Sequence, residues 1–268
     1  MNVRIKSPGA GELHGIYMPV KDARAGIMLV HGLGEHTGRY SHLAEYFNQN
    51  GYSFIGLDLP GHGKSPGKRG HISSFRVCNN IIDSMHAHLR KERDDLPVVL
   101  YGHSLGGGMA LNYLLSADNI QKAVISSPWL KLRDEPPRMK VLLASVVQFI
   151  MPSFVQTSGL DPEDYSSDPD IVKDYISDPL NHPMISAGLY LSAVRNAEEL
   201  LRCRDELSVP VLLIHGGKDR ILSVDGSRIF AGNNPMAELR IWEEGLHELH
   251  NETFREEVME YILGWLNK

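Results

Sequence analysis

Hydrophobic residues along the chain form two kinds of pattern that follow each other in turn. Two short strands are predicted within residues 3–18, and nearly continuous apolar runs predict buried strands at 26–31, 52–57, 98–101, 122–126, 209–214 and 239–242. Apolar residues three and four positions apart predict helices around 43–47 and at 75–95, 109–115, 224–230 and 254–266. This alternation is typical of an α/β fold with a mostly parallel central sheet, helices on both faces and sites at the carboxyl ends of the strands.

The alternation of strands and helices stops after residue 130 and resumes at residue 209. We therefore predict a core formed by residues 1–130 and 209–268, with a helical cap inserted at 131–208. Within the cap, residues 140–155 are apolar on nearly all sides, yet fewer than the ~20 residues that span a bilayer. The pattern leaves two alternatives open. The segment is either a helix buried against the core, or a tunnel wall or exposed patch that docks transiently on lipid or micelle surfaces.

Residues 102–106 read Gly-His-Ser-Leu-Gly, a G-x-S-x-G motif between a predicted strand and a predicted helix. In this context the motif is typical of the nucleophile elbow of an α/β-hydrolase fold, in which a sharp turn exposes the serine hydroxyl. We expect the two glycines to adopt φ values that a side chain resists, and to let the strand and the helix approach closely. Ser104 is therefore the candidate nucleophile, and the alternative is a glycine-rich turn with an incidental serine.

A serine hydroxyl needs a base that takes its proton and an acid that orients this base. In α/β-hydrolases these partners follow the serine in the order acid, then histidine. Asp219 comes after the predicted strand at 209–214 and His247 after the one at 239–242, so we predict both as members of a catalytic triad. His250 is the rival base. Its spacing from His247 is one residue too short for the zinc motif H-E-x-x-H, so no metal site is predicted.

The reaction also needs hydrogen-bond donors for the negatively charged oxygen of the tetrahedral intermediate, each worth about 3–4 kcal/mol. The backbone N–H of Leu105, at the start of a predicted helix, is one expected donor. The second is the N–H of Leu33, in the glycine-rich loop after the strand at 26–31. These groups complete an oxyanion hole, and the chemistry requires neither a metal ion nor an organic cofactor.

Composition predicts a soluble globular protein and argues against a nucleic-acid partner. Hydrophobic residues make up 42% and charged residues 22% of the chain, and its net charge is −6 without a Lys/Arg-rich run. Cys78 and Cys203 have no metal or redox spacing and suit a reducing compartment. The first residues lack the apolar segment of a secretory signal, and no run of ~18 apolar residues can span a bilayer. We expect a cytoplasmic protein, with peripheral contact with membranes as an option.

Five longer stretches carry a more specific signature, at residues 31–40 (H-G-L-G-E-H-T-G-R-Y), 58–65, 102–107, 174–180 and 247–250. Together they resemble the monoacylglycerol lipase family. The resemblance implies a cap over the site, a lipophilic acyl tunnel and a small polar pocket for the glycerol group. The polar-pocket positions that match are Glu35, Arg39, His103, Tyr175 and His250. Leu33 is larger than the family's usual residue, and the rest of the cap matches poorly, so the resemblance does not fix the acyl-chain preference.

The resemblance implies hydrolysis of a small lipid ester, a monoacylglycerol, to a fatty acid and glycerol through an acyl-enzyme. Glu35 and Arg39, four residues apart, have a simpler alternative as an ion pair at a helix start. A lysophospholipase and a general carboxylesterase are the alternative activities, and an aminopeptidase would use Glu35 to bind the substrate's amino group. Outside enzymes, the alternative is a hydrolase-derived protein that binds a lipophile without turnover.

Overall fold

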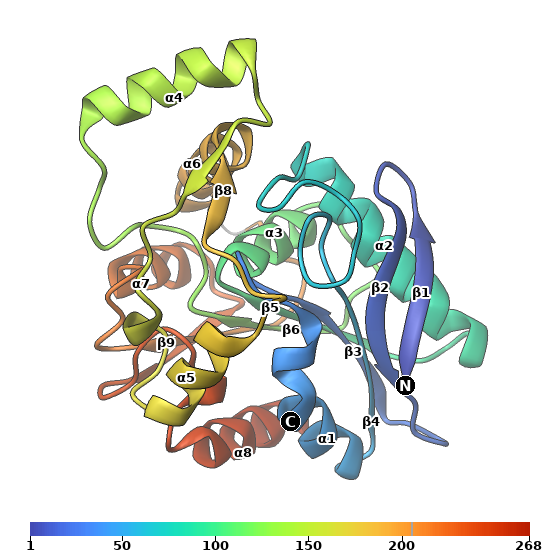
Figure 1. The fold of residues 1–268 in the computed structure, drawn as a ribbon. Coiled ribbons are helices and arrows are strands. Elements are labelled where there is room, and N and C mark those ends of the chain that lie inside the picture. The colour runs from blue at the N-terminus through green and yellow to red at the C-terminus, as the bar shows by residue number, and fades with distance from the viewer. Residues whose placement is uncertain (205) are drawn as a thin grey trace.

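The computed structural model describes residues 1–204 and 206–268. At its centre the strands of these residues form a sheet with the order β1-β2-β4-β3-β5-β6-β9-β10 (Figure 1). Their bounds are β1 Asn2–Ser7, β2 Gly11–Met18, β3 Ala25–Val30, β4 Tyr52–Leu57, β5 Val98–His103, β6 Lys122–Ser126, β9 Val211–Gly216 and β10 Ala237–Trp242. Strands β4, β3, β5, β6, β9 and β10 pair in parallel, whereas β2 runs antiparallel to both β1 and β4. The predicted mostly parallel α/β sheet is confirmed.

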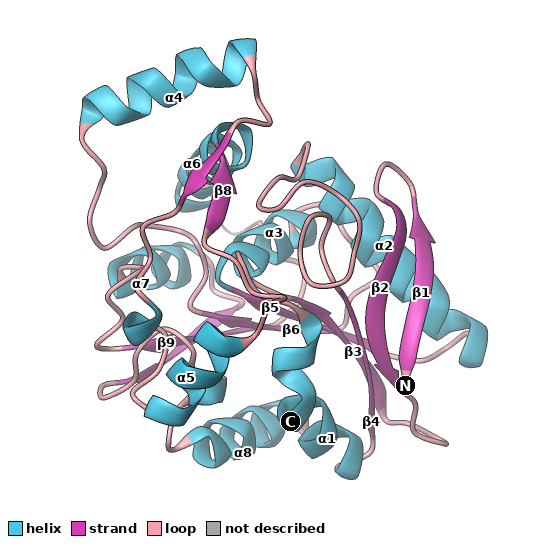
Figure 2. Ribbon diagram, in the orientation of Figure 1, coloured by secondary structure: helices cyan, strands magenta, loops and turns pink. Residues whose placement is uncertain are grey.

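Helices cover both faces of the sheet because alternate residues of each strand point to opposite sides (Figure 2). In β3, Ile27 and Leu29 pack in one apolar cluster with helices α1 (Ser41–Gln49) and α8 (Arg255–Leu266). Met28 and Val30 pack on the other face in a cluster with α2 (Phe75–Glu92), α3 (Ser104–Leu114) and α7 (Val224–Asn233). Every residue of β3, β4, β5 and β9 is buried, which explains their continuous apolar sequence pattern.

Residues 131–208, called the insert below, lie between β6 and β9. Among the described residues it contains α4 Arg138–Ile150, β7 Val155–Thr157, the 3₁₀ helix η2 Pro162–Asp164, α5 Pro169–Ser177, β8 Met184–Ser186 and α6 Ala187–Arg202. Helix α6 packs against α3, and α4 lies over α6 at the outer edge of the molecule (Figure 1). Ile185 and Leu189 of the insert are buried in the same apolar cluster as α2 and α3. The insert and the core therefore share one hydrophobic core.

The exposure of helix α4 distinguishes the two alternatives that its sequence leaves open. The exposed fraction is 92% for Phe149, 75% for Ile150 and 64% for Leu143. The exposed apolar surface continues just beyond the helix at Met151 and Phe154. The alternative of a helix buried against the core is therefore wrong, because α4 packs against α6 and these described side chains are exposed. No helix among the described residues is long and apolar enough to cross a membrane.

Helix α3 begins very close to strand β3, and Gly106 makes this approach possible. A Cβ atom at Gly106 would lie 2.2 Å from the carbonyl oxygen of Val30 and 2.3 Å from that of His31. Both oxygens belong to the main chain at the end of a buried strand. Because the interior is closely packed, this main chain cannot move aside. By contrast, a Cβ atom at Gly264 in α8 would have no atom within 4 Å.

We predict that Gly106→Ala destabilises the fold by about 1–3 kcal/mol, as overpacking of a core does. The expected fall in Tm is roughly 2–10 °C, measured by thermal unfolding followed with circular dichroism. Gly264→Ala is the matched control and should hold or raise Tm, because alanine favours a helix over glycine by about 0.5–1 kcal/mol. A Gly106→Ala protein that melts at or above the wild-type temperature would contradict this account.

Candidate active site

Ser104 lies at the junction of β5 and α3, where its backbone has a φ of 53°. This left-handed conformation costs a non-glycine residue roughly 1–3 kcal/mol and persists only where the surrounding structure enforces it. The expectation that the flanking glycines carry the unusual φ values is wrong, because neither Gly102 nor Gly106 has a positive φ. Their expected role in close approach is confirmed, since a Cβ atom at Gly102 would lie 2.7 Å from the Cβ of Ala110. The strain of the elbow therefore falls on the serine itself.

Three side chains from three strand ends form one chain of hydrogen bonds. The Ser104 hydroxyl donates to Nε2 of His247 at 2.9 Å, and Nδ1 of His247 donates to Oδ2 of Asp219 at 2.8 Å. Asp219 follows β9 and His247 follows β10, so all three residues lie at the carboxyl edge of the parallel sheet. The backbone N–H groups of Ile221 and Leu222 donate to Oδ1 of Asp219 at 2.8 and 2.9 Å and fix its carboxylate. The structure thus brings together the residues expected as nucleophile, base and acid.

Burial and the Asp219 charge together set the protonation of this chain. The side chains of His247 and Asp219 are 3% and 1% exposed. Burial disfavours the ionised carboxylate, but the neighbouring histidines outweigh it and hold the pKa of Asp219 well below its usual range. Burial also lowers the pKa of His247, yet the Asp219 carboxylate outweighs this effect, so the pKa of His247 lies above 6.5. His247 is therefore a stronger base than a free imidazole.

The rival histidine, His250, occupies a different place. It is fully buried in the 3₁₀ helix η3 (Leu249–Asn251) and stacks on the ring of Tyr40, with ring centroids 4.5 Å apart. The ring of His103 meets it edge-on, with ring centroids 5.0 Å apart. Burial lowers the pKa of His250 to about 3, so it stays neutral near pH 7. Of the two candidate bases, His247 is the one hydrogen-bonded to Ser104.

The two expected oxyanion donors flank Ser104. Leu105 follows it in the first turn of α3, and Leu33 lies in the loop after β3. A Cβ atom at Gly32, the neighbour of Leu33, would be 3.2 Å from the Cβ of Ser104, so this loop runs beside the nucleophile. The peptide group that carries the Leu33 N–H also carries the Gly32 carbonyl, which accepts a 2.8 Å hydrogen bond from Nδ1 of His31. That bond fixes the orientation of the peptide group, as a preorganised donor requires.

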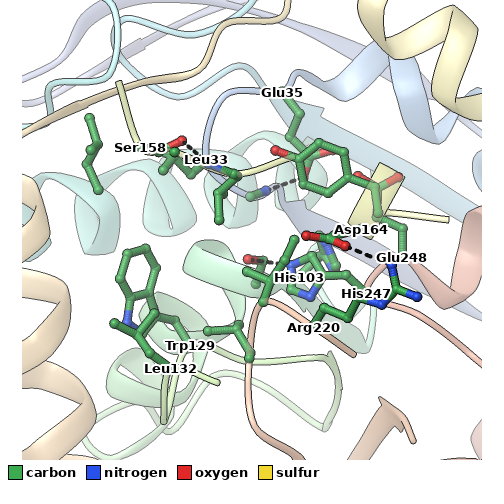
Figure 3. A pocket seen from close by; sticks show the side chains of 18 of the residues that line it. Leu33, Glu35, His103, Trp129, Leu132, Ser158, Asp164, Arg220, His247 and Glu248 are labelled. Atoms are coloured by element: carbon green, nitrogen blue, oxygen red, sulfur yellow. Dashed lines mark hydrogen bonds and ion pairs between the residues drawn. The ribbon is translucent and has the colours of Figure 1, made fainter. Parts of the chain in front are cut away.

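A cavity of about 340 Å³ opens beside Ser104 and has an apolar and a polar part (Figure 3). The apolar part is lined by Trp129, Leu132, Leu160, Ile185, Tyr190, Ile221 and Leu222. The polar part is lined by Glu35, His103, Tyr175 and Glu248. A second, mainly apolar groove of about 650 Å³ shares walls with this cavity, among them Trp129 and Tyr190, and extends to α4. Together the two spaces suit a molecule with one long apolar and one small polar part.

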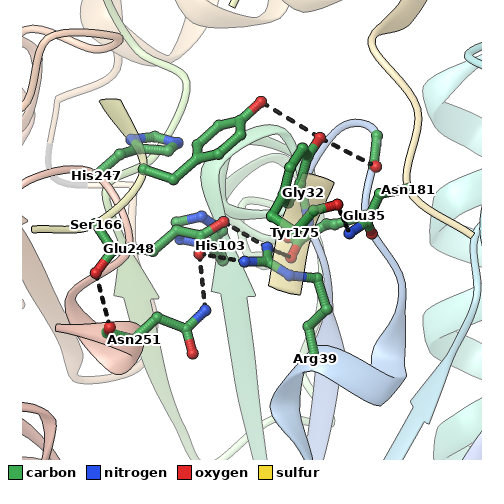
Figure 4. A network of polar contacts seen from close by, with 12 residues as sticks. Gly32, Glu35, Arg39, His103, Ser166, Tyr175, Asn181, His247, Glu248 and Asn251 are labelled. Atoms are coloured by element: carbon green, nitrogen blue, oxygen red, sulfur yellow. Dashed lines mark hydrogen bonds and ion pairs between the residues drawn. The ribbon is translucent and has the colours of Figure 1, made fainter. Parts of the chain in front are cut away.

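Arg39 joins two carboxylates at the polar part of the cavity (Figure 4). Its guanidinium donates to both carboxylate oxygens of Glu248, at 2.5 and 2.7 Å, and to Oε2 of Glu35 at 3.0 Å. The side chains of Arg39, Glu35 and Glu248 are 9%, 3% and 3% exposed. Burial would raise the pKa of Glu248, but Arg39 outweighs it and the pKa is lowered, whereas at Glu35 burial dominates and raises the pKa. The ion pair expected between Glu35 and Arg39 exists, but Glu248 is the stronger partner.

The structure separates the five positions that the resemblance assigns to a polar pocket. Glu35, His103 and Tyr175 line the cavity of the nucleophile. The guanidinium of Arg39 lies 4.8 Å from the ring centroid of Tyr175 and lines a different cavity of about 310 Å³. His250 is buried next to His103 and lines neither of these two cavities. Direct contact with a molecule in the main cavity is therefore open to the first three residues only.

Glu248 is a cavity residue that sequence reasoning misses. It follows His247 directly, its backbone N–H donates to the carbonyl of Tyr165 in the insert at 2.8 Å, and Asn251 donates to its Oε2 at 2.7 Å. The only signal in the sequence is a carboxylate next to the candidate base. Its partner Arg39 lies 209 positions away, so no local pattern connects the two.

Comparisons with known proteins agree with this arrangement. The family model Hydrolase_4, described as serine aminopeptidase, S33, matches residues 21–254. The crystal structure of a monoacylglycerol lipase from Paleococcus ferrophilus superposes with a TM-score of 0.87 and is 37% identical, covering 95% of this chain and 98% of that chain. The phospholipase YtpA of Bacillus subtilis is 32% identical, over 87% of this chain and 91% of its own length.

A longer relative contains this unit as a part. An uncharacterized abhydrolase domain-containing protein of Dictyostelium discoideum is 32% identical over 91% of this chain, which spans 26% of that relative. The family model covers most of the chain, and the solved structure shares its sheet and helices over nearly the full length. The chain therefore belongs to the Hydrolase_4 family, serine aminopeptidase S33, and has the α/β-hydrolase fold.

Proposed function

We propose that the protein hydrolyses monoacylglycerols to a fatty acid and glycerol through an acyl-enzyme on Ser104. The observation that carries this proposal is the hydrogen-bonded chain of Ser104, His247 and Asp219, which opens into a cavity with an apolar and a polar part. The apolar part suits an acyl chain, and the small polar part suits a glycerol group. Similarity to a monoacylglycerol lipase supports the same class of substrate.

The proposed reaction begins when the Ser104 hydroxyl attacks the ester carbonyl and Nε2 of His247 takes its proton. The backbone N–H groups of Leu33 and Leu105 hold the negatively charged oxygen of the tetrahedral intermediate. His247 then gives the proton to the departing glycerol oxygen, while Asp219 stabilises the imidazolium. A water molecule, activated by the same histidine, hydrolyses the acyl-enzyme and releases the fatty acid.

The buried charges of the polar part favour a neutral alcohol over a substrate with an amino group. An aminopeptidase needs a carboxylate that is free to pair with an ammonium group. Arg39 occupies both oxygens of Glu248, and Glu35 already accepts hydrogen bonds from Arg39, from the Gly32 N–H and from the Tyr40 hydroxyl. We therefore favour ester hydrolysis over an aminopeptidase that binds the substrate's amino group at Glu35.

A lysophospholipid is the second candidate substrate, and one observation favours it. Arg220 lines the cavity with a side chain that is 66% exposed, so its guanidinium can meet a phosphate group. The same guanidinium lies 3.3 Å from Oδ1 of Asp164, whose charge opposes an anionic headgroup. Because this charge is already paired, we place the monoacylglycerol first, although the phospholipase relative supports the second candidate.

We also propose that the insert is the cap of this site and that α4 meets the lipid surface from which the substrate comes. Tyr165, Tyr175 and Tyr190 of the insert line the cavity. The groove that shares wall residues with this cavity reaches Leu142 of α4, so a lipid at α4 would meet apolar residues on its way toward Ser104. Shallow insertion of a few apolar side chains makes such contact reversible, as expected of a peripheral protein.

We expect the purified protein to hydrolyse monooleoylglycerol with a higher kcat/KM than lysophosphatidylcholine, measured by fatty-acid release. Ser104→Ala should lower kcat by roughly 10⁴-fold or more, because the nucleophile is lost. Asp164→Asn removes the charge that faces Arg220, so it should raise turnover of lysophosphatidylcholine relative to monooleoylglycerol. A wild-type protein that prefers lysophosphatidylcholine would overturn the first choice of substrate.

The pH dependence of kcat/KM should have an acid limb with a pKa above 6.5. His247 takes the serine proton only when neutral, so activity falls as the pH drops through its pKa, which Asp219 raises. Asp219→Asn should lower kcat by about 10⁴-fold and move the limb to lower pH, since the carboxylate is gone. A wild-type limb below 6.5 would show that Asp219 does not control the base.

The double variant Phe149→Ser, Ile150→Ser should bind phosphatidylcholine vesicles that contain monooleoylglycerol about tenfold more weakly, measured by flotation. Full burial of each such side chain is worth about 1.5–3 kcal/mol, and shallow insertion that realises only about 1.4 kcal/mol of this for the pair corresponds to a tenfold change. Ile176→Ser on α5 is the matched control, since its side chain is 67% exposed but lies on another helix of the insert. All variants should keep wild-type activity on soluble p-nitrophenyl butyrate. Equal vesicle binding by the double variant and the wild type would rule out α4 as the contact.

A further inference from the structure

A second buried histidine, His215, contacts Asp219 of the candidate triad. It lies near the end of β9 and is fully buried. Its Nε2 is 3.2 Å from Oδ2 of Asp219, the same oxygen that accepts the hydrogen bond from His247. Its other nitrogen, Nδ1, is 2.8 Å from the hydroxyl of Ser227 in α7. The hydrogen-bonded chain therefore continues from Asp219 through His215 to α7.

The partners of His215 determine which ring nitrogen carries the proton. Nε2 faces two acceptors, the Asp219 carboxylate and the carbonyl oxygen of Leu222 at 3.3 Å, so Nε2 must be the donor. Nδ1 is then an acceptor, and the Ser227 hydroxyl donates to it. Ser227 is itself fully buried, so water does not compete for this hydroxyl. A neutral ring with the proton on Nε2 satisfies every one of these contacts.

We propose that His215 is a positioning residue for the ester hydrolysis, which holds and partly neutralises the Asp219 carboxylate through its Nε2–H, while the Ser227 hydroxyl holds the ring at Nδ1. Two backbone N–H groups already hold Oδ1 of Asp219, and His215 supplies the second donor to Oδ2. Each hydrogen bond to a buried carboxylate favours its ionised form. The inference rests on the proposed triad, because it assigns His215 a role only through Asp219.

The consequence is a change in the basicity of His247. Without the His215 donor, Oδ2 carries more negative charge toward His247, which favours the imidazolium and raises the pKa of the base. The groups that face His247 are Asp219, the carboxylates Glu248 and Glu35, and the rings of His103 and Tyr165, 4.9 and 6.4 Å away. Among the contacts of the described residues, Asp219 is the one that joins His215 to His247.

The test is the pH profile of p-nitrophenyl butyrate hydrolysis by three variants, with Tm measured for each. His215→Leu should lower kcat about tenfold or more, which is the loss expected for one hydrogen bond to a charged group, and leave KM within about twofold. Its acid limb should move to higher pH. His215→Gln keeps an N–H donor and should restore most of kcat and the wild-type limb. Ser227→Ala removes the hydrogen bond that holds the ring at Nδ1 and should shift the limb in the same direction as His215→Leu, by less.

The control is His86→Leu, which removes a histidine from α2, away from the sheet edge that holds the triad. It should leave both kcat and the acid limb unchanged. A lowered Tm for His215→Leu with an unmoved limb would reduce His215 to a structural residue and overturn the inference. If His215→Leu does not fold, an unmoved limb together with wild-type kcat in Ser227→Ala would overturn it equally.

Failure of the proposed function has a different signature. A wild-type protein that hydrolyses no ester at all contradicts the triad, and with it the role of His215. A wild-type protein that hydrolyses p-nitrophenyl butyrate but not monooleoylglycerol contradicts only the proposed substrate. The pH profiles of the His215 variants then still test the role of His215.

Discussion

One buried carboxylate, that of Asp219, is the constraint on which the rest of the site depends. A charge removed from water costs several kcal/mol unless hydrogen bonds compensate it. Two backbone N–H groups of its own loop and two imidazole rings, His215 and His247, supply that compensation. The loops after β9 and β10 must therefore meet at the sheet edge, and their meeting places His247 within hydrogen-bonding distance of Ser104.

A second buried charge shapes the polar part of the cavity, where we propose that the leaving group binds. Arg39 belongs to the 3₁₀ helix η1 (Thr37–Tyr40), Glu248 follows the proposed base His247, and Tyr175 of the insert lies over the guanidinium. One ion pair thus connects the core, the loop of the base and the proposed cap. Loss of one partner of such a buried pair costs about 3–5 kcal/mol, so the polar wall is held rigidly. A rigid wall with its charges paired suits the hydroxyls of a neutral alcohol.

The sequence predicts those parts of this structure whose signal is local. Each central strand is buried on both faces and therefore reads as an apolar run, and motifs at strand ends meet because parallel strands share a carboxyl edge. The exposure of α4 could not be predicted, because an all-round apolar pattern is the same for a buried helix and an unpartnered one. The contacts of Glu248 and His215 could not be predicted either. The partner of Glu248, Arg39, is distant in sequence. The partner of His215, Asp219, lies near the same strand end, but no motif connects the two residues. The positive φ at Ser104 follows from packing around the elbow rather than from its glycines.

The most direct test of the central claim is mass spectrometry of the native protein after reaction with a fluorophosphonate, followed by peptide mapping. The account predicts one covalent adduct per chain, on the peptide that contains Ser104, and none in Ser104→Ala. It also predicts that prior incubation with monooleoylglycerol slows labelling, because the substrate occupies the same cavity. A folded wild-type protein that stays unlabelled, or that is labelled at another serine, would contradict it.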